Sequence, residues 1–272
     1  MRPAAKIEAS GYRLIALDST SSTNDEAAAA ARQGDLGRLW IVADEQRAGR
    51  GRHGRTWISP RGNLYASLLL IDPCEPAVAA QLGFVAGVAL HEAVAAQTGL
   101  GGPRLALKWP NDLLLDGAKI AGLLLEGHSG RAGSFALVIG FGVNIVDAPD
   151  DTAYPAKALQ AVRSDVTAEG LLSALACSFA SHFDAWREAR ADGAGDPFNA
   201  IRQRWLARAA GIGQTVTVRL SAGERRGAFM GLDAAGRLQL RTPAGTELID
   251  AGDLYFPASL AADAQTVSPI SR

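Results

Sequence analysis

Ten residues, Gln46 to Arg55 (QRAGRGRHGR), constrain the fold more than any other segment of the chain. Gly49, Gly51 and Gly54 match the spacing G-x-G-x-x-G, which in dinucleotide-binding proteins joins a strand to a helix. Here the runs before and after it, LWIVADE and NLYASLLLI, are both typical of strands. The loop therefore joins two strands, and we expect no NAD- or FAD-binding turn.

The rest of the chain predicts hairpin-linked strands and separate helices. Asp116-Gly117 lies between apolar runs, which is a strong signal for a two-residue hairpin turn. A helix is expected after Ser22, with a capping box between Thr23 and Glu26 and with Gly34 as its C-cap. The remaining helices are expected at 78–98, 171–190 and 197–210, and the strands at 12–18, 39–45, 63–71, 105–109, 113–115, 119–126 and 134–145. This mixture indicates an α+β fold and not a doubly wound one.

The pattern changes after Ala210. Residues 214–256 alternate in short apolar runs such as TVTVRL and RLQLRT, separated by glycine-containing turns, which predicts a small all-β unit. We therefore expect a domain at 1–210, a second at 211–257 and a flexible tail at 258–272.

Composition excludes several classes of protein. Of the 272 residues 48% are hydrophobic, enough for a sizeable core, and the net charge of −1 argues against a non-specific nucleic-acid binder. Cys74 and Cys177 lie far apart without a CxxC pair, so we expect neither a zinc site nor a disulfide. The N-terminus lacks a signal peptide, and no apolar run approaches the ~20 residues of a membrane helix. We expect a cytoplasmic protein.

The loop itself is rich in cations: Arg47, Arg50, Arg52 and Arg55 alternate with its glycines. Arginine donates forked hydrogen bonds to carboxylate and phosphate oxygens, and glycine lets the backbone wrap closely around a ligand. We interpret the loop as one that orders over an anionic ligand and shields it from water. Two alternatives stay open, namely a solvated basic loop and a nucleic-acid patch, although Trp57 is its one aromatic residue and stacking platforms usually offer several.

Three further polar clusters lie among apolar runs. They are the triplet STN at 22–24, the string LKWPNDL at 107–113 and the string GAKIAG at 117–122. The strand at 134–145 contains two glycines, which often mark close approach to a ligand. These clusters can line one face of the sheet; alternatively, Lys108 and Lys119 are surface positions of a hairpin.

In their order, the strings STN, QRAGRGRHGRTW, LKWPNDLLL, GAKIAGLLLEG and GFGVN resemble those of bacterial biotin protein ligases, over roughly residues 12–256. The resemblance implies a mixed β-sheet with packed helices, like the catalytic domain of class II synthetases, and a small SH3-like β-barrel. It implies a ligase that joins biotin to ATP, with Mg²⁺, and transfers biotin from biotinyl-5′-AMP to a lysine. The implied partner is the biotin carboxyl carrier protein of acetyl-CoA carboxylase.

The resemblance also implies roles for individual residues. Lys119, Arg52 and Asp112 would be catalytic, with Mg²⁺ near Asp112 and no side-chain cluster dedicated to a metal. The residues implied to bind biotin or biotinyl-5′-AMP are Ser22, Thr23, Asn24, Gln46, Arg50, Gly51, Arg52, Trp57, Lys119 and Gly122. Those implied to bind ATP are Arg52, Arg55, Trp57, Asn111 and Asn144.

Two departures from the family qualify this reading. A second serine-threonine pair precedes the triplet, and we assign the intact one, Ser22-Thr23-Asn24. Some members begin with a helix-turn-helix domain, for which about ten residues before the first strand are too few. We therefore expect no DNA binding and no repressor role. The resemblance leaves the monomer and the homodimer open.

The alternative enzyme is a lipoate or octanoate ligase or transferase of the same broad fold. An acyl-enzyme version of it would need a nucleophilic cysteine, and neither Cys74 nor Cys177 lies in a site motif.

Overall fold

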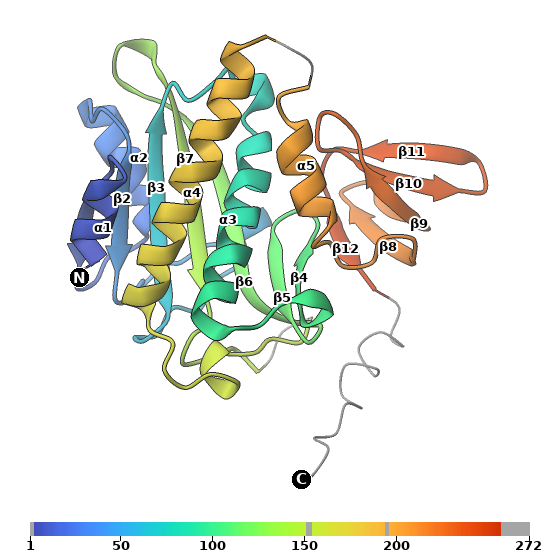
Figure 1. The fold of residues 1–272 in the computed structure, drawn as a ribbon, viewed down its shortest axis with the longest axis horizontal. Coiled ribbons are helices and arrows are strands. Elements are labelled where there is room, and N and C mark those ends of the chain that lie inside the picture. The colour runs from blue at the N-terminus through green and yellow to red at the C-terminus, as the bar shows by residue number, and fades with distance from the viewer. Residues whose placement is uncertain (1–2, 151–153, 194–195, 257–272) are drawn as a thin grey trace.

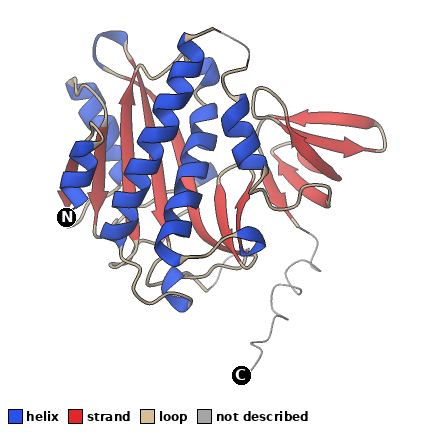
Figure 2. Ribbon diagram, viewed as in Figure 1, coloured by secondary structure: helices blue, strands red, loops and turns tan. Residues whose placement is uncertain are grey.

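The computed structural model describes residues 3–150, 154–193 and 196–256 (Figures 1 and 2). Its centre is a seven-stranded mixed sheet of order β1-β2-β3-β7-β6-β5-β4. Only β1 and β2 pair in parallel within this sheet; the other neighbours are antiparallel. The strands are β1 (Arg13–Leu17), β2 (Leu39–Ala43), β3 (Leu64–Ile71), β4 (Leu105–Lys108), β5 (Asp112–Leu115), β6 (Ala118–Ser129) and β7 (Phe135–Val143). The expected α+β fold with a mixed sheet is confirmed.

Helices cover both faces of this sheet. They are α1 (Pro3–Ala9), α2 (Thr23–Gln33), α3 (Gln81–Thr98), α4 (Ala168–Ala191) and α5 (Asn199–Leu206). The long helices α3 and α4 pack against each other across one face, as Figure 1 shows, and α2 packs against β2, β3 and β7 from the other. The sheet is thus the middle layer of a three-layer arrangement.

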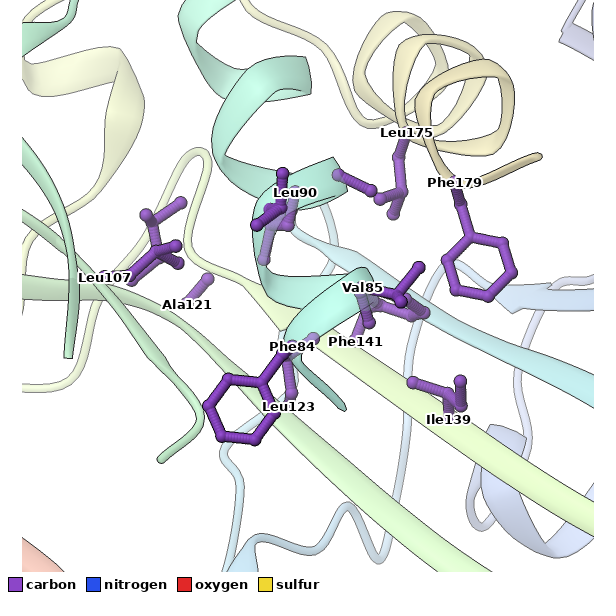
Figure 3. Close-up of a cluster of buried hydrophobic side chains, with 14 of the residues drawn as sticks. Phe84, Val85, Leu90, Leu107, Ala121, Leu123, Ile139, Phe141, Leu175 and Phe179 are labelled. Atoms are coloured by element: carbon purple, nitrogen blue, oxygen red, sulfur yellow. The ribbon is translucent and has the colours of Figure 1, made fainter. Parts of the chain in front are cut away.

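The strands alternate between two apolar cores, as the two-residue period of a strand requires. On β3, Leu68 and Leu70 belong to the larger core under α3 and α4, whereas Leu69 belongs to the smaller core under α2. Figure 3 shows part of the larger core, to which α3 contributes Phe84 and α4 contributes Phe179. Each such side chain contributes ~1.5–3 kcal/mol by leaving water.

Helix α2 begins differently from the prediction. Ser22 is its N-cap residue but makes no side-chain capping bond, and the carboxylate of Glu26 accepts a hydrogen bond from Thr20 (2.6 Å). The prediction of a capping box was wrong, because Glu26 accepts its hydrogen bond from Thr20 and because Thr23 is already the first residue of the helix. Gly34 does end the helix, with a φ of 92° that favours glycine. The hydroxyls of Ser22 and Thr23 are therefore left for other contacts.

The other differences between the predicted and the observed helices concern the ends of helices and one short helix that was not predicted. Helix α1 was not expected, α3 starts at Gln81 because 76–78 form a 3₁₀ turn, and α5 ends at Leu206. The hairpin turn at Asp116-Gly117 is confirmed, since both residues have the positive φ (51° and 79°) of such turns.

A second, five-stranded antiparallel sheet follows, with the order β11-β10-β9-β8-β12. Its strands are β8 (Thr215–Leu220), β9 (Gly223–Leu232), β10 (Leu238–Thr242), β11 (Gly245–Ile249) and β12 (Asp253–Tyr255). This is the small all-β unit that the alternating pattern predicted. Its Val218 and Phe229 belong to the same apolar cluster as the larger core. The division at Ala210 stays a proposal, and the predicted tail at 258–272 lies outside the described residues.

Within the described ranges, no helix is both long and apolar enough to cross a membrane.

A polar cluster ties α3 to α4 and to the segment after α5. Glu92 accepts hydrogen bonds from Ser178 (3.0 Å), His182 (2.7 Å) and Arg208 (3.1 Å). Partial burial works to raise the pKa of Glu92, but the hydrogen bond and charge of His182, with Ser178 and Arg208, outweigh it. The pKa therefore lies below its ordinary value.

Replacing Glu92 by Gln is expected to lower the free energy of unfolding by about 1–2 kcal/mol at neutral pH, because charge-assisted hydrogen bonds are lost. A carboxylate with a lowered pKa stabilises the fold above its ordinary value of about 4.3, and this stabilisation disappears as pH falls through the folded-state pKa. Urea unfolding at neutral pH and near pH 3.5 measures both effects. The difference between wild type and Glu92→Gln should shrink in acid, and a constant difference contradicts this account.

Candidate active site

A cavity of about 450 Å³ opens on the α2 side of the large sheet, between the loop that follows β2 and strand β12. Its walls come from α2, the loop, β5, β6, β7 and the second sheet. Every residue to which the sequence assigned a role lines it: Ser22, Thr23, Asn24, Gln46, Arg50, Gly51, Arg52, Arg55, Trp57, Asn111, Asp112, Lys119, Gly122 and Asn144. The fold thus gathers segments that are far apart in sequence, while their individual roles remain proposals.

Glycines on β7 let two of these side chains approach the sheet. A Cβ atom on Gly140 would lie 2.4 Å from Asn24 Oδ1, and one on Gly142 would lie 2.5 Å from the ring of Trp57. Both distances are shorter than a carbon atom tolerates. The two glycines of GFGVN are therefore required by close approach, here of Asn24 and Trp57.

A β-bulge aims Lys119 into the cavity. On β6, alternate residues through Gly122 face the cavity, and this alternation alone would turn Lys119 toward the core side. Between Leu113 and Leu114 the pairing shifts, so that Leu113 opposes Ala121 but Leu114 opposes Lys119. The extra residue reverses the alternation, as bulges do. Lys119 consequently shares a face with Gly122 and with Asp112.

Asp112 lies between two lysines. Lys119 Nζ is 2.6 Å from Asp112 Oδ1 and Lys108 Nζ is 3.1 Å from Oδ2. Burial works to raise the pKa of Asp112, but the charges of Lys119 and Lys108 outweigh it and the pKa is lowered. Burial also lowers the pKa of Lys108, against the opposing effect of Asp112. The carboxylate is thus held charged by two cations and has little tendency to take up a proton.

Aromatic rings complete the wall beside Lys108. Its Nζ lies 4.0 Å from the centre of the Tyr154 ring and 6.0 Å from that of Tyr255 on β12. On the other side, Lys119 Nζ lies 5.4 Å from the centre of the Trp57 ring. These distances permit cation–π attraction. The two lysines are therefore fixed cations of the site and not solvated hairpin positions.

The arginines of the loop are paired with carboxylates. Arg50 donates two hydrogen bonds to Asp25 on α2 (2.7 and 2.8 Å), and its guanidinium lies 3.7 Å from Glu126. That interaction lowers the pKa of Asp25, chiefly through the hydrogen bond. Arg50 thus lines the cavity while its donors already bind the protein.

The other end of the loop is tied to the second sheet. Arg52 donates to the Gly252 carbonyl (3.0 Å) and lies 3.5 Å from Asp253, which also pairs with Arg55. Burial lowers the pKa of Arg52, and Asp253 opposes this. Asp253, on β12, therefore pairs with both Arg52 and Arg55, the two loop arginines that the sequence predicts to bind ATP.

Oxygen ligands for a Mg²⁺ ion are few. Among the described residues, no three His, Cys, Asp or Glu gather where they could hold a metal. Asp112 and Asn111 offer the oxygen donors that Mg²⁺ takes, but both carboxylate oxygens of Asp112 bind lysines. This donor set fits an ion held chiefly by phosphate oxygens of a nucleotide, with at most one or two protein ligands.

Other residues that line the cavity are polar and uncharged, among them Thr23 and Gln46. The backbone N–H of Thr23 donates to Gln46 Oε1 (2.9 Å), and Gln46 Nε2 donates to Ser59 (3.1 Å). Ser59 in turn donates to the carbonyl of Trp57 (2.9 Å). Side chains of α2 and of the loop are thereby joined into one hydrogen-bonded wall.

The sequence of this chain is similar to those of known proteins. Residues 16–144 match the family model described as Biotin/lipoate A/B protein ligase family, and residues 211–256 match Biotin protein ligase C terminal domain. The biotin--[acetyl-CoA-carboxylase] ligase of Paracoccus denitrificans is 42% identical over 243 residues, covering 87% of this chain and 98% of that protein. The enzyme of the same name from Mycobacterium tuberculosis is 32% identical, covering 90% of each.

The fold agrees with solved structures. Biotin protein ligase from Aquifex aeolicus in complex with biotin and ATP superposes with a TM-score of 0.75 at 26% identity, covering 89% of this chain and 97% of that one. Biotin protein ligase from Leishmania major in complex with biotinyl-5-AMP gives 0.60 at 26% identity, covering 88% and 98%. Fold and cavity thus define a protein of the biotin and lipoate ligase class. The chain belongs to the biotin protein ligase family.

Several cavity residues were missed in the sequence. Tyr154, Asp253 and Tyr255 line the cavity but lie in segments without a recognised motif. Asp253 and Tyr255 come from the second sheet, and no local spacing relates them to Arg52. Lys108, whose role was left open, is identified as the second cation on Asp112.

Replacing Asp253 by Asn is expected to free Arg52 and Arg55 and to speed cleavage of the loop by trypsin, which cuts after arginine. The rate should rise about fivefold or more, because losing a partly buried carboxylate costs its arginines on the order of 1 kcal/mol. Cleavage is followed by mass spectrometry of the peptides that end at these two arginines. Glu247→Gln, which removes an exposed ion pair with Arg225 (3.3 Å), is the control. Equal rates in the two variants would show that Asp253 does not hold the loop.

Proposed function

We propose that this protein is a biotin protein ligase that activates biotin with ATP and transfers it to a lysine of a carboxylase carrier domain. In the first step a biotin carboxylate oxygen attacks the α-phosphorus of ATP, and the bond to pyrophosphate breaks. In the second step the lysine amine attacks the acyl carbon of biotinyl-5′-AMP, AMP leaves with the bonding electrons, and the amine loses a proton.

The observation that carries this proposal is that one cavity is lined by two kinds of polar group. The amide and hydroxyl groups of Ser22, Thr23, Asn24 and Gln46 suit a ureido ring with N–H donors and a carbonyl. The cations, Lys119 among them, suit a place where a carboxylate must approach a phosphate. Two anions repel each other, and fixed cations offset that repulsion in the transition state.

These positions support the roles that we propose for individual residues. Lys119 binds the biotin carboxylate, Arg52 and Arg55 exchange Asp253 for phosphate oxygens, and Trp57 packs against the ligand. Asn111 and Asn144 contact the nucleotide, while Gly51 and Gly122 let the backbone approach the ligand. Arg50 reaches the biotin side while paired with Asp25. Mg²⁺, bound with ATP, supplies further positive charge at the phosphates.

Asp112 has two candidate roles in the second step: it orients the incoming carrier lysine, or it accepts the proton of that lysine. Both carboxylate oxygens bind lysines and the pKa is lowered, so it is a poor proton acceptor. We assign it the role of orienting Lys108 and Lys119.

The partner and the location belong to this proposal as well. The carrier is the biotin carboxyl carrier protein of acetyl-CoA carboxylase, in keeping with the names of the relatives from Paracoccus and Mycobacterium. Such a carrier places the protein in the cytoplasm. Absence of DNA binding and the choice between monomer and homodimer stay predictions.

The lipoate or octanoate alternative has less support. Neither Cys74 nor Cys177 is among the residues that line the cavity. Cys177 is exposed on α4, and burial raises the pKa of the Cys74 thiol, which makes it a poorer nucleophile.

Biotin-dependent exchange of pyrophosphate into ATP tests the first step. Lys119→Ala and Arg52→Ala should each lower the exchange rate about a hundredfold or more, because each removes a cation that stabilises transition-state charge. Lys6→Ala, an exposed position on α1, is the matched control and should exchange at the wild-type rate. Circular dichroism verifies that all variants are folded.

Two results would contradict the proposal. Wild-type protein that exchanges pyrophosphate with lipoate but not with biotin would assign it to the alternative class. Wild-type rates in both Lys119→Ala and Arg52→Ala would refute the assigned roles.

A further inference from the structure

A chain of polar side chains runs from Glu126 on β6 to Gln46, which lies in the loop and lines the cavity. Asn24 Nδ2 donates to Glu126 Oε2 (2.6 Å), and the Ser67 hydroxyl lies 2.5 Å from Asn24 Oδ1 and 2.7 Å from Thr23 Oγ1. Thr23 Oγ1 in turn lies 3.1 Å from Gln46 Oε1. Ser67 is completely buried, and Thr23 and Asn24 are 3% and 6% exposed.

This chain has more oxygen–oxygen contacts than hydroxyl hydrogens, so one of the contacts has no hydrogen between its two oxygens. Three oxygen–oxygen contacts join Asn24 to Ser67, Ser67 to Thr23, and Thr23 to Gln46. Only the two hydroxyl groups carry a hydrogen that can lie in them, one on Ser67 and one on Thr23. The direction in which these hydrogens point decides which contact remains without one.

Glu126 sets that direction. Its carboxylate lies 3.7 Å from the guanidinium of Arg50, and as an anion it only accepts hydrogen bonds. Asn24 must therefore turn its amide nitrogen to Glu126 and its carbonyl to Ser67. Ser67 then donates to Asn24. The single hydrogen of Thr23 goes to the nearer of its two oxygen neighbours, which is Ser67 Oγ at 2.7 Å and not Gln46 Oε1 at 3.1 Å.

The contact left without a hydrogen is the one between Thr23 Oγ1 and Gln46 Oε1. Gln46 cannot supply it by rotating its amide, because its oxygen accepts from the backbone N–H of Thr23 and its nitrogen donates to Ser59. Both Thr23 and Gln46 line the cavity. Two acceptor oxygens thus lie 3.1 Å apart at the cavity wall without a hydrogen between them, and an N–H group of a ligand can donate to both.

We propose that Glu126 is a positioning residue which, through Asn24 and Ser67, keeps the acceptor pair of Thr23 and Gln46 open for an N–H group of the ligand. This inference rests on the proposed function and deepens it. The ureido ring of biotin brings such an N–H group, whereas the dithiolane ring of lipoate has none and would leave the contact between the two oxygens without a hydrogen. Sites that hydrogen-bond a substrate N–H reject analogues without it strongly. The acceptor pair therefore selects biotin over other acyl acids.

Glu126→Gln tests the direction without changing the shape of the side chain. The Gln amide can turn its N–H to the Asn24 carbonyl, so that Asn24 donates to Ser67, Ser67 to Thr23 and Thr23 to Gln46. The contact between Thr23 and Gln46 then contains a hydrogen from Thr23, so a ligand N–H group no longer gains a hydrogen bond there. We expect the KM for biotin in pyrophosphate exchange to rise about tenfold, the loss of one hydrogen bond to a buried acceptor.

Two further readouts separate this role from a general loss of structure. The kcat should stay within about twofold, because the ring contact is made equally in the ground state and the transition state. The inhibition constant of lipoate as a competitor of biotin should stay the same or fall, since the penalty on a ligand without N–H is removed. Glu247→Gln, far from the cavity on β11, is the control and should leave all three values unchanged.

Glu126 also contacts Arg50, and a double-mutant cycle distinguishes the two routes. Ser67→Cys keeps the volume but interrupts the chain with a weak donor. If Glu126 acts through Ser67, Glu126→Gln in the Ser67→Cys background changes the KM for biotin by less than about twofold, since coupled residues are not additive. A full tenfold rise in that background would place the effect on Arg50 and overturn the proposal.

Failure of this inference differs from failure of the proposed function. Wild-type protein without biotin-dependent exchange would refute the function itself. Active wild type together with an unchanged KM in Glu126→Gln would refute only the role of Glu126.

Discussion

The ion triad of Asp112 with Lys108 and Lys119 is the interaction on which the cavity depends. A carboxylate this deeply enclosed is tolerated because two ammonium groups lie within 3.1 Å of its oxygens. Removing one partner of such a buried group leaves charge without compensation, which typically costs about 3–5 kcal/mol. The triad also brings β4, β5 and β6 into one arrangement, since each contributes one member. The same contacts therefore hold the sheet together and keep a cation aimed at the ligand.

Much of this site could be predicted from the sequence, because its residues lie in strings whose order and spacing are specific. The strand on each side of the arginine loop, the Asp-Gly hairpin and the Ser-Thr-Asn turn were all local signals. The prediction that failed, the capping box at Thr23, also rested on a local sequence pattern. It failed because Thr20, which lies outside the helix, donates a hydrogen bond to Glu26. Propensity alone could not reveal that competition.

The rest of the site depends on register and on distant contacts. The direction of Lys119 follows from a bulge, and an insertion of one residue in pairing leaves no mark on the sequence. Asp253 and Tyr255 reach the cavity from a second sheet, and Asp253 lies some two hundred residues after the loop arginines that it contacts. The role of Glu126 needed the positions of four other polar side chains, because a hydrogen-bond direction belongs to a network and not to a residue.

The paired arginines of the loop have a consequence for the speed of turnover. Arg50, Arg52 and Arg55 already bind carboxylates of the protein, so in the proposed reaction a phosphate or a biotin carboxylate replaces an anion and does not meet a bare cation. Such a replacement breaks and forms similar contacts, and its free-energy change is smaller than that of either contact alone. The enzyme can then hold a charged intermediate without trapping it, because the internal carboxylates stand ready to take the arginines back when the product leaves.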